Sequence, residues 1–280
     1  MRKVAIEVFY WLDRWADDQV STFARAAAAG FDGVEISFVS GPAIDWQRMR
    51  NELDRLGLSV FASTGLSPAT DITSADASVR AAGVEYLKRC LESASRVGSP
   101  ILGGVAYAPW LYFPGERDVR PFRERSAAAM HAVAQTAADL GLTICIEVLN
   151  RFETFMFNTA REGLAYLDMV AAPNVKLQLD TYHMNMEEDD LGAAIRLAGS
   201  RLGHFHCAAN NRRLPGPGHI HWPAIRAALD DAGYAGWLVI ETFPNPGVET
   251  GRAVNTWRPL VEEPAGDLRR SLQFLHENVC

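Results

Sequence analysis

Acidic and imidazole side chains end four consecutive apolar runs in the second half of the chain. The runs read ICIEVLN, KLQLDTYH, GHFHCA and WLVIETF, and they end on Glu147, Asp180, His206 and Glu241. Such runs are typical of buried strands, so a polar group at each end needs a partner. Three carboxylates in one pocket would repel one another and raise their pKa values, and a divalent cation removes that conflict. The four residues therefore predict a metal centre.

The chemistry of these donors indicates which ion the centre holds. Two Glu, one Asp and one His form a mostly oxygen ligand set, which suits Mn²⁺, Mg²⁺ or Co²⁺ better than structural Zn²⁺. We expect Mn²⁺, with Co²⁺ or Mg²⁺ as alternatives. Any one of the four residues, taken alone, could instead be a salt-bridge partner or a helix cap. Their succession on neighbouring run ends favours the metal.

Three further polar residues follow the same runs at short distances. Glu153 lies six residues after Glu147, His183 three after Asp180, and Arg212 six after His206. We expect them to contact a polar ligand held at the metal. The alternatives are a loop charge for Glu153, a helix cap for His183, and simple neutralisation of the acidic site by Arg212.

Aromatic residues gather after two of the other runs. The first group is Phe9, Tyr10, Trp11 and Trp15, and the second is Tyr107, Trp110, Tyr112 and Phe113. In loops that follow strands they would wall a sugar pocket, because C–H faces of a sugar pack on aromatic rings. Core packing is the alternative.

Other polar residues allow more than one interpretation. Glu35 ends the second run and is either a supporting partner of the site or part of a structural salt bridge. His204 faces the same side of its strand as His206 but lies deeper, which favours a core histidine over a fifth ligand. His219 and His221 belong to LPGPGHIHWP, which is typical of a rigid turn.

The elements that must position these residues form a repeat. A helical segment reaches a Gly, which ends the helix, and a short apolar run follows, as in ADLGLTICIEVL. Such continuous runs are typical of parallel strands buried on both faces. Eight are expected: Val4–Phe9, Gly33–Ser37, Ser59–Thr64, Ile101–Ala106, Thr143–Leu149, Val175–Asp180, Gly203–Cys207 and Trp237–Thr242. A helical pattern follows each; examples are Asp45–Leu56, Ala75–Val97, Phe122–Leu140, Thr159–Val170, Pro223–Asp231 and Asp267–Glu277.

Eight strand–helix units in 280 residues predict a single-domain α/β protein, a (β/α)8 TIM barrel over residues 1–280. A doubly wound open sheet is the alternative, but it usually carries a Gly-rich phosphate turn after its first strand, which this chain lacks. The longest irregular stretches, Tyr107–Arg120 and Phe243–Glu263, would lie on the face of the barrel where the strands end. That face is where such enzymes work.

Composition restricts the partners. With 34 acidic and 27 basic residues the net charge is −7, and no basic block is present, which argues against nucleic acid. No apolar stretch approaches the ~20 residues that span a bilayer, and the N-terminus lacks a signal-peptide pattern. The four cysteines lie far apart, as expected of reduced core residues. These features predict a cytoplasmic protein with a small polar ligand.

The chain resembles the ketose 3-epimerases of the D-tagatose and D-psicose (D-allulose) group, within the xylose-isomerase-like barrels. The resemblance covers nearly the whole chain. It depends on the motifs IEVLNRFETF, LDTYHMNMEE, HFHCAANNRRLPGPG, IETF, GRAVNTWRP and RRSLQF.

The resemblance implies a function and roles for the residues named above. The reaction would be metal-dependent epimerisation of a free ketose at C3 through a cis-enediolate, with Glu147 and Glu241 as the acid–base pair. Glu147, Asp180, His206 and Glu241 would bind the metal. Glu153, His183 and Arg212, with Trp15 and Trp110 in the wall, would contact the sugar. A homodimer or homotetramer is also implied.

The sequence departs from the group's pattern at one place. An acidic residue that often precedes the Asn-Arg pair is replaced by Ala209, which puts a contact near Arg212 in doubt but no metal ligand. Alternative functions are an aldose–ketose or hydroxypyruvate-type isomerase on the same barrel, an abasic-site endonuclease and a non-catalytic sugar-binding barrel. The endonuclease would need more histidine ligands and a basic DNA track, and the complete ligand quartet argues against a barrel that only binds sugar.

Overall fold

Eight parallel strands close into a barrel in the computed structural model, which describes residues 1–280. The strands are hydrogen-bonded in chain order, and the last pairs with the first, so the sheet has no edge. They are β1 (Val4–Glu7), β2 (Gly33–Ser37), β3 (Ser59–Leu66), β4 (Ile101–Pro109), β5 (Thr143–Glu147), β6 (Val175–Asp180), β7 (Leu202–Cys207) and β8 (Leu238–Ile240). The expected fold class, a single-domain (β/α)8 barrel, is confirmed.

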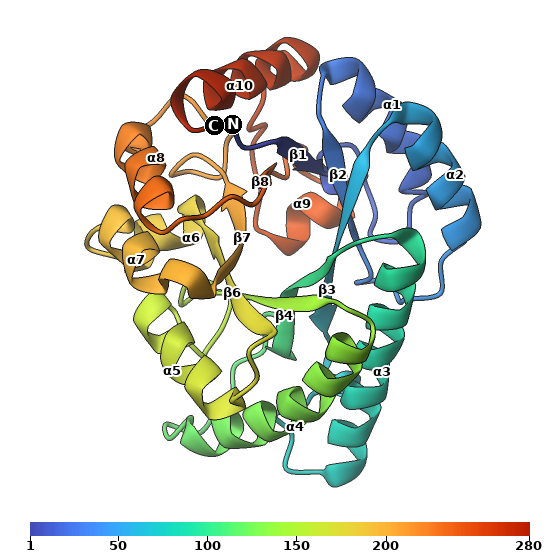
Figure 1. Cartoon of the computed structure of the whole chain (residues 1–280), viewed down its shortest axis with the longest axis vertical. Helices are drawn as coiled ribbons and strands as arrows, with labels where there is room; N and C mark the ends of the chain where they lie inside the picture. Colours follow the sequence, from blue (N-terminus) through green and yellow to red (C-terminus); the bar gives the residue numbers. More distant parts are fainter.

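Helices surround the barrel as an outer ring, with β1 and β8 meeting near the two chain termini (Figure 1). The helices are α1 (Val20–Ala29), α2 (Trp46–Leu56), α3 (Ala77–Val97), α4 (Arg120–Asp139), α5 (Ala160–Val170), α6 (Thr181–Glu187), α7 (Leu191–Ala198), α8 (Trp222–Asp231), α9 (Glu249–Ala253) and α10 (Pro264–Asn278). The short helix α9 lies over the middle of the barrel in this view and not in the ring. None of them combines the length and apolar character needed to cross a membrane.

Local sequence signals explain where the helices begin and end. Gly30, Gly57 and Gly98 end α1, α2 and α3 in the left-handed conformation, which glycine adopts without a Cβ clash. Thr159 and Glu162 form a capping box at the start of α5, each side chain bonded to the other's backbone N–H. These residues end and begin the helices that connect consecutive strands.

Side chains point alternately into and out of the barrel along each strand, so the inward-pointing side chains form two levels. The lower level is an apolar cluster of Ala5, Phe61, Ile101, Cys145 and Val239. Residues two positions further along the strands share the same face and carry polar groups, for instance Glu7, Glu147 and Glu241. The upper half of the barrel interior is therefore polar and opens toward the ends of the strands.

The structure differs from the expected elements at a few boundaries. β1 ends at Glu7, because Val8–Tyr10 forms a 3-10 helix, and β8 covers Leu238–Ile240, which places Glu241 just beyond the strand. β5 likewise ends at Glu147 and not at Leu149. The stretch expected to be irregular before α10 contains the short helix α9.

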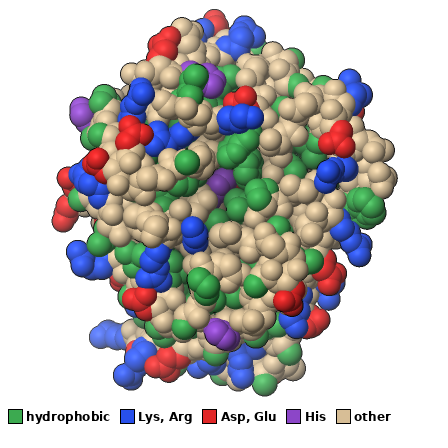
Figure 2. All heavy atoms as spheres, viewed as in Figure 1, with side chains coloured by type: hydrophobic (Ala, Val, Ile, Leu, Met, Phe, Trp, Pro, Cys, Tyr) green, Lys and Arg blue, Asp and Glu red, His purple; other side chains and the backbone are tan.

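The surface viewed along the barrel carries charges of both signs. Figure 2 shows Lys and Arg interspersed with Asp and Glu around the rim, and apolar side chains toward the centre of that face. This face therefore carries no continuous basic track.

Candidate metal centre and active site

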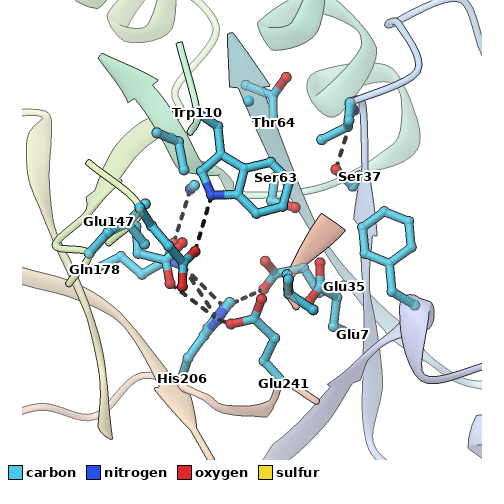
Figure 3. A pocket seen from close by; sticks show the side chains of 18 of the residues that line it. Glu7, Glu35, Ser37, Ser63, Thr64, Trp110, Glu147, Gln178, His206 and Glu241 are labelled. Atoms are coloured by element: carbon cyan, nitrogen blue, oxygen red, sulfur yellow. Dashed lines mark hydrogen bonds and ion pairs between the residues drawn. The ribbon is translucent and has the colours of Figure 1, made fainter. Parts of the chain in front are cut away.

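Four polar side chains converge where β5 to β8 end. Donor atoms of Glu147, Asp180, His206 and Glu241 all lie within 4.8 Å of one another, and all four side chains are buried. Glu147, His206 and Glu241 line a pocket that encloses about 520 Å³ of empty space, mouth included. Figure 3 shows His206 and Glu241 at its floor, with Glu147 and Gln178 on one side. The structure thus brings the four expected ligands together.

Glu241 contacts two neighbouring charged or ionisable side chains. Its Oε2 lies 3.0 Å from Nδ1 of His206, and Nη2 of Arg212 lies 2.9 Å from its Oε1. Burial alone would raise the pKa of Glu241, but the positive charge of Arg212 and the contact with His206 hold it well below its ordinary value. Glu241 is therefore ionised near neutral pH.

Glu147 lies in a different environment. Its Oε1 is buried without a hydrogen-bond partner, 3.9 Å from Nδ1 of His206. Burial and the negative charge of Glu241 raise the pKa of Glu147 well above its ordinary value. A bound cation would give this unpaired buried oxygen a partner and would offset the repulsion among the carboxylates. The donors present therefore fit a hard or borderline divalent cation.

Asp180 ends β6 and begins α6. Its Oδ1 accepts a hydrogen bond from the backbone N–H of Tyr182 at 2.8 Å, which caps the helix. Its other carboxylate oxygen pairs with Arg212. Asp180 is therefore fixed by a helix cap and by an ion pair, and its side chain is fully buried.

Arg212 bridges two of the candidate ligands. Its guanidinium contacts Asp180 and Glu241 and lies over the ring of Tyr182, 4.6 Å from the centroid. The backbone of Arg212 has φ +64°, a conformation that non-glycine residues adopt rarely and that clusters at functional sites. Both charge partners of Arg212 come from the site, so Ala209 does not leave it unpaired.

The other ring nitrogen of His206, Nε2, also has a hydrogen-bond partner. Nε2 lies 3.3 Å from Oε2 of Glu35, which in turn lies 2.7 Å from Nε2 of His204. Gln178 approaches the same ring, with its Nε2 3.3 Å from His206 Nε2. Glu35 thus contacts a candidate ligand, and His204 is a buried histidine with a carboxylate partner. Donor atoms of Glu35, His204 and His206 also lie within 4.8 Å of one another, so these contacts agree with both of the alternatives stated for each residue.

Sequence reasoning missed Gln178. Its Oε1 accepts a hydrogen bond from the backbone N–H of Gly104 at 3.1 Å, so the amide is held between β4 and His206. A Cβ at Gly103 would lie 2.6 Å from that oxygen, which explains the glycine. One feature of the sequence could have identified it: Gln178 lies two residues before Asp180 and therefore on the same face of the strand.

Glu153 and His183 lie together on the β5–β6 side of the pocket. Nδ1 of His183 accepts a hydrogen bond from the backbone N–H of Asn150 at 3.2 Å, so the neutral ring carries its proton on Nε2. Asn150 and Trp110 donate to the two carboxylate oxygens of Glu153, each at 3.1 Å. Burial lowers the pKa of His183 to about 4 and raises that of Glu153. Nε2 of His183 has no partner.

Aromatic rings line the outer part of the pocket. Trp15 and Trp110 meet edge to face at 5.9 Å, and Phe9 packs against Trp15. Tyr107 was wrongly expected in the wall: β4 continues to Pro109, and Tyr107 packs in the core against Phe157, 4.3 Å between centroids.

The chain is similar to several known enzymes over nearly its whole length. A D-psicose 3-epimerase of Agrobacterium fabrum is 35% identical to it over 97% of each chain. An L-ribulose 3-epimerase of Methylomonas sp. is 36% identical over 94% of each. A crystal structure of D-psicose 3-epimerase determined in the presence of D-fructose superposes with a TM-score of 0.95, at 34% identity and 99% coverage of both chains.

These relatives support the expected resemblance to ketose 3-epimerases. They also confirm the expected enzyme class, an isomerase acting on carbohydrates. The sequence profile of the xylose isomerase-like TIM barrel family matches residues 23–277. The chain therefore belongs to the xylose isomerase-like TIM barrel family.

Proposed function

We propose that this enzyme epimerises free ketoses at C3 with the help of a divalent cation. The observation that carries the proposal is the placement of two carboxylates in one pocket, Glu147 at the end of β5 and Glu241 just after β8, with oxygens 3.9 and 3.0 Å from Nδ1 of His206. Relatives named for D-psicose and L-ribulose 3-epimerisation support it. Candidate substrate pairs are D-tagatose and D-sorbose, D-fructose and D-psicose, and L-ribulose with its epimer.

Epimerisation requires removal of the C3 proton and its return to the opposite face. A divalent cation held by Glu147, Asp180, His206 and Glu241 would polarise the C2 carbonyl and so make that proton more acidic. Glu147 and Glu241 then act as base and acid on the two faces of C3. The direction of the reaction determines which of them removes the proton.

The other pocket residues bind the sugar and fix its orientation. His183 offers a free Nε2–H that can donate to a substrate oxygen, with the ring held in place by Asn150. Arg212 carries a permanent positive charge beside Glu241, where negative charge develops on the substrate oxygens. Glu153 accepts from substrate hydroxyls, and the rings of Trp15 and Trp110 cover the sugar.

The site of isotope exchange tests this proposal. The enzyme loaded with Mn²⁺ is incubated with a ketose in D₂O, and the recovered sugars are analysed by NMR and chromatography. We expect deuterium at C3 together with the C3 epimer. Deuterium confined to C1 with an aldose product would instead establish an aldose–ketose isomerase, for which one base is enough.

The proposal also covers the working ion, the assembly and the location of the protein. We propose Mn²⁺ as the working ion, with Co²⁺ or Mg²⁺ as substitutes, a homodimer or homotetramer as the assembly, and the cytoplasm as the location. Metal analysis and light scattering of the purified protein test the first two.

A further inference from the structure

Gln178 is a buried amide for which the proposed reaction has no use. It belongs to β6, it lines the pocket, and it is fully buried. Its Oε1 accepts a hydrogen bond from the backbone N–H of Gly104 at 3.1 Å. This bond fixes the direction of the amide, so the nitrogen on its other side points at His206 (Figure 3). Burial of an amide is costly unless both of its polar groups find partners, and here both do.

The contact with His206 is made with the face of the ring. Nε2 of Gln178 lies 3.3 Å from Nε2 of His206 and 3.5 Å from Nδ1. The two ring nitrogens flank Cε1, so an atom in the ring plane at these two distances would overlap that carbon. The amide nitrogen therefore lies over the face of the imidazole, where its N–H meets the π electrons and not a lone pair. Both ring nitrogens stay available for partners at the edge.

The other two contacts of His206 are made at the edge of the ring. Nε2 lies 3.3 Å from Oε2 of Glu35, and Nδ1 lies 3.0 Å from Oε2 of Glu241. Contacts at two edge atoms still allow the ring to tilt about the line that joins them. Gln178 opposes that tilt, because its amide packs on the face and is anchored at Gly104. A cation binds the lone pair of an imidazole nitrogen, which lies in the ring plane, so the tilt decides whether Nδ1 points at the cation.

β4 is shaped to receive this amide. Gly104 has φ +89°, a conformation that glycine tolerates, and its N–H is the donor to Gln178. A Cβ at Gly103 would lie 2.6 Å from Oε1 of Gln178, and a Cβ at Gly104 would lie 2.5 Å from the carbonyl oxygen of Thr64. A larger residue at either position would displace the strand or the amide. The two consecutive glycines therefore keep Gln178 against His206.

We propose that Gln178 is a positioning residue, which holds the plane of the His206 ring so that Nδ1 points at the bound cation. The proposal rests on the proposed function, because it needs a cation at the four candidate ligands, and it adds the group that orients one of them. Partners that orient a histidine ligand affect metal affinity although they do not contact the ion. Loss of the Gln178 amide should therefore weaken the binding of the cation.

The test measures Mn²⁺ binding to the metal-free protein by isothermal titration calorimetry. Gln178→Met keeps the length of the side chain but lacks both amide groups, and it should raise the Kd by about 10- to 100-fold. The EPR spectrum of the Mn²⁺-saturated variant should also be broader than that of the wild type, because a ring that is free to tilt gives the ion a range of environments. An unchanged Kd overturns the proposal.

Gln19→Met is the matched control. Gln19 is also a buried glutamine whose amide is bonded at both ends, to the backbone carbonyl and N–H of Ser37 at 2.7 and 2.9 Å. It is not among the candidate ligands. The substitution should lower the free energy of unfolding, measured with urea, but leave the Kd for Mn²⁺ within about twofold of the wild type. An equal rise of the Kd in both variants would show a general structural effect and overturn the proposal.

A double-mutant cycle shows whether Gln178 acts through the ring. His206→Leu removes the imidazole and should itself weaken Mn²⁺ binding. In that background Gln178→Met should change the Kd by less than about twofold, because the group that Gln178 positions is gone. A further loss as large as in the wild-type background would mean that the amide acts on the cation directly, which contradicts the proposal.

These measurements need no turnover, so the two proposals can fail separately. A protein that shows the effect of Gln178 on Mn²⁺ but leaves every ketose unchanged would contradict the proposed epimerisation and support the role of Gln178. An enzyme that epimerises ketoses at C3, but whose Gln178→Met variant binds Mn²⁺ as tightly as the wild type, would do the reverse.

Discussion

Oε2 of Glu35 lies 3.3 Å from Nε2 of His206, while Nδ1 of the same ring lies 3.0 Å from Glu241. The two ring nitrogens are thus divided between a supporting carboxylate and the candidate metal centre. A histidine ligand whose second N–H is bonded to a carboxylate is fixed in orientation and becomes a better donor. The contact with Glu35 would therefore leave Nδ1 of His206 as the donor to a cation.

The first prediction follows from this contact. Glu35→Gln should weaken Mn²⁺ binding by about 10- to 100-fold, because the amide is a poorer acceptor for the imidazole N–H. Isothermal titration calorimetry on the metal-free protein measures the change. Glu188→Gln is the control, since Glu188 is a partly buried carboxylate that accepts a hydrogen bond from the backbone of Ala160 and is not among the candidate ligands. Equal affinities for wild-type and Glu35→Gln would show that the contact has no effect.

Much of the site could be predicted from the sequence, because strand alternation and chain order are enough to bring residues such as Glu147 and Asp180 together. A polar residue that directly ends an apolar run faces inward when the run is a barrel strand, and neighbouring strands bring such residues into contact. Spacing alone also indicated Glu153, His183 and Arg212, which line the same pocket.

Other features depend on long-range contacts that no local pattern encodes. Gln178 lies within an apolar run, and its role depends on Gly104 of a different strand. Glu7 lay inside the first expected strand, which ends two residues earlier than expected because a 3-10 helix follows it. Tyr107 is a core residue because β4 extends to Pro109, and composition does not specify strand length.

Removal of the metal should destabilise the protein as well as inactivate it. EDTA leaves the carboxylates of Glu147, Asp180 and Glu241 without their cation, so we expect loss of turnover and a lower midpoint of thermal unfolding. Mn²⁺ or Co²⁺ should reverse both effects, and at a concentration 100-fold above its Kd an ion adds about 2.7 kcal/mol to the free energy of unfolding. Activity that survives EDTA in protein shown to be metal-free would contradict a metal centre.

The two proposed bases should be separable by isotope exchange. In Glu147→Gln or Glu241→Gln one face of C3 has no base, so epimerisation should fall by about 10²- to 10⁴-fold. The remaining carboxylate can still remove a proton from one epimer and return it to the same face. Each variant should therefore incorporate deuterium into one ketose without inversion, and the two variants should label opposite epimers.

Metal content is the control for these two variants. Elemental analysis must show that each variant keeps its ion, since both residues are also expected ligands. Two variants that label the same epimer, or that epimerise within about tenfold of wild type, would contradict a mechanism with one base on each face.

A side chain at Gly103 should displace the amide of Gln178. A Cβ there would lie 2.6 Å from Oε1 of Gln178, so Gly103→Ala must displace the amide from Gly104 and from His206. Leaving these buried groups unpaired should cost about 1–3 kcal/mol of unfolding free energy. Urea denaturation measures the loss. Gly115→Ala is the control, because a Cβ at Gly115 meets nothing within 4 Å. Equal stability of the two variants would show that Gly103 does not shape the site.

His183 should make the stability of the metal-free enzyme depend on pH. Burial holds its pKa at about 4 against an ordinary value of 6.5. Between these values the unfolded chain binds a proton that the folded protein does not, so the free energy of unfolding falls as the pH falls.

The size of this effect can be isolated with a variant. Between pH 7 and pH 5 the contribution of His183 should be about 2 kcal/mol, and His183→Gln should lose that part of the pH dependence. Urea denaturation of the EDTA-treated proteins at both pH values gives the difference. His221→Gln removes an exposed histidine and should retain the wild-type slope. A His183→Gln slope equal to that of wild type would mean that the ring takes up a proton equally well in the folded and the unfolded protein.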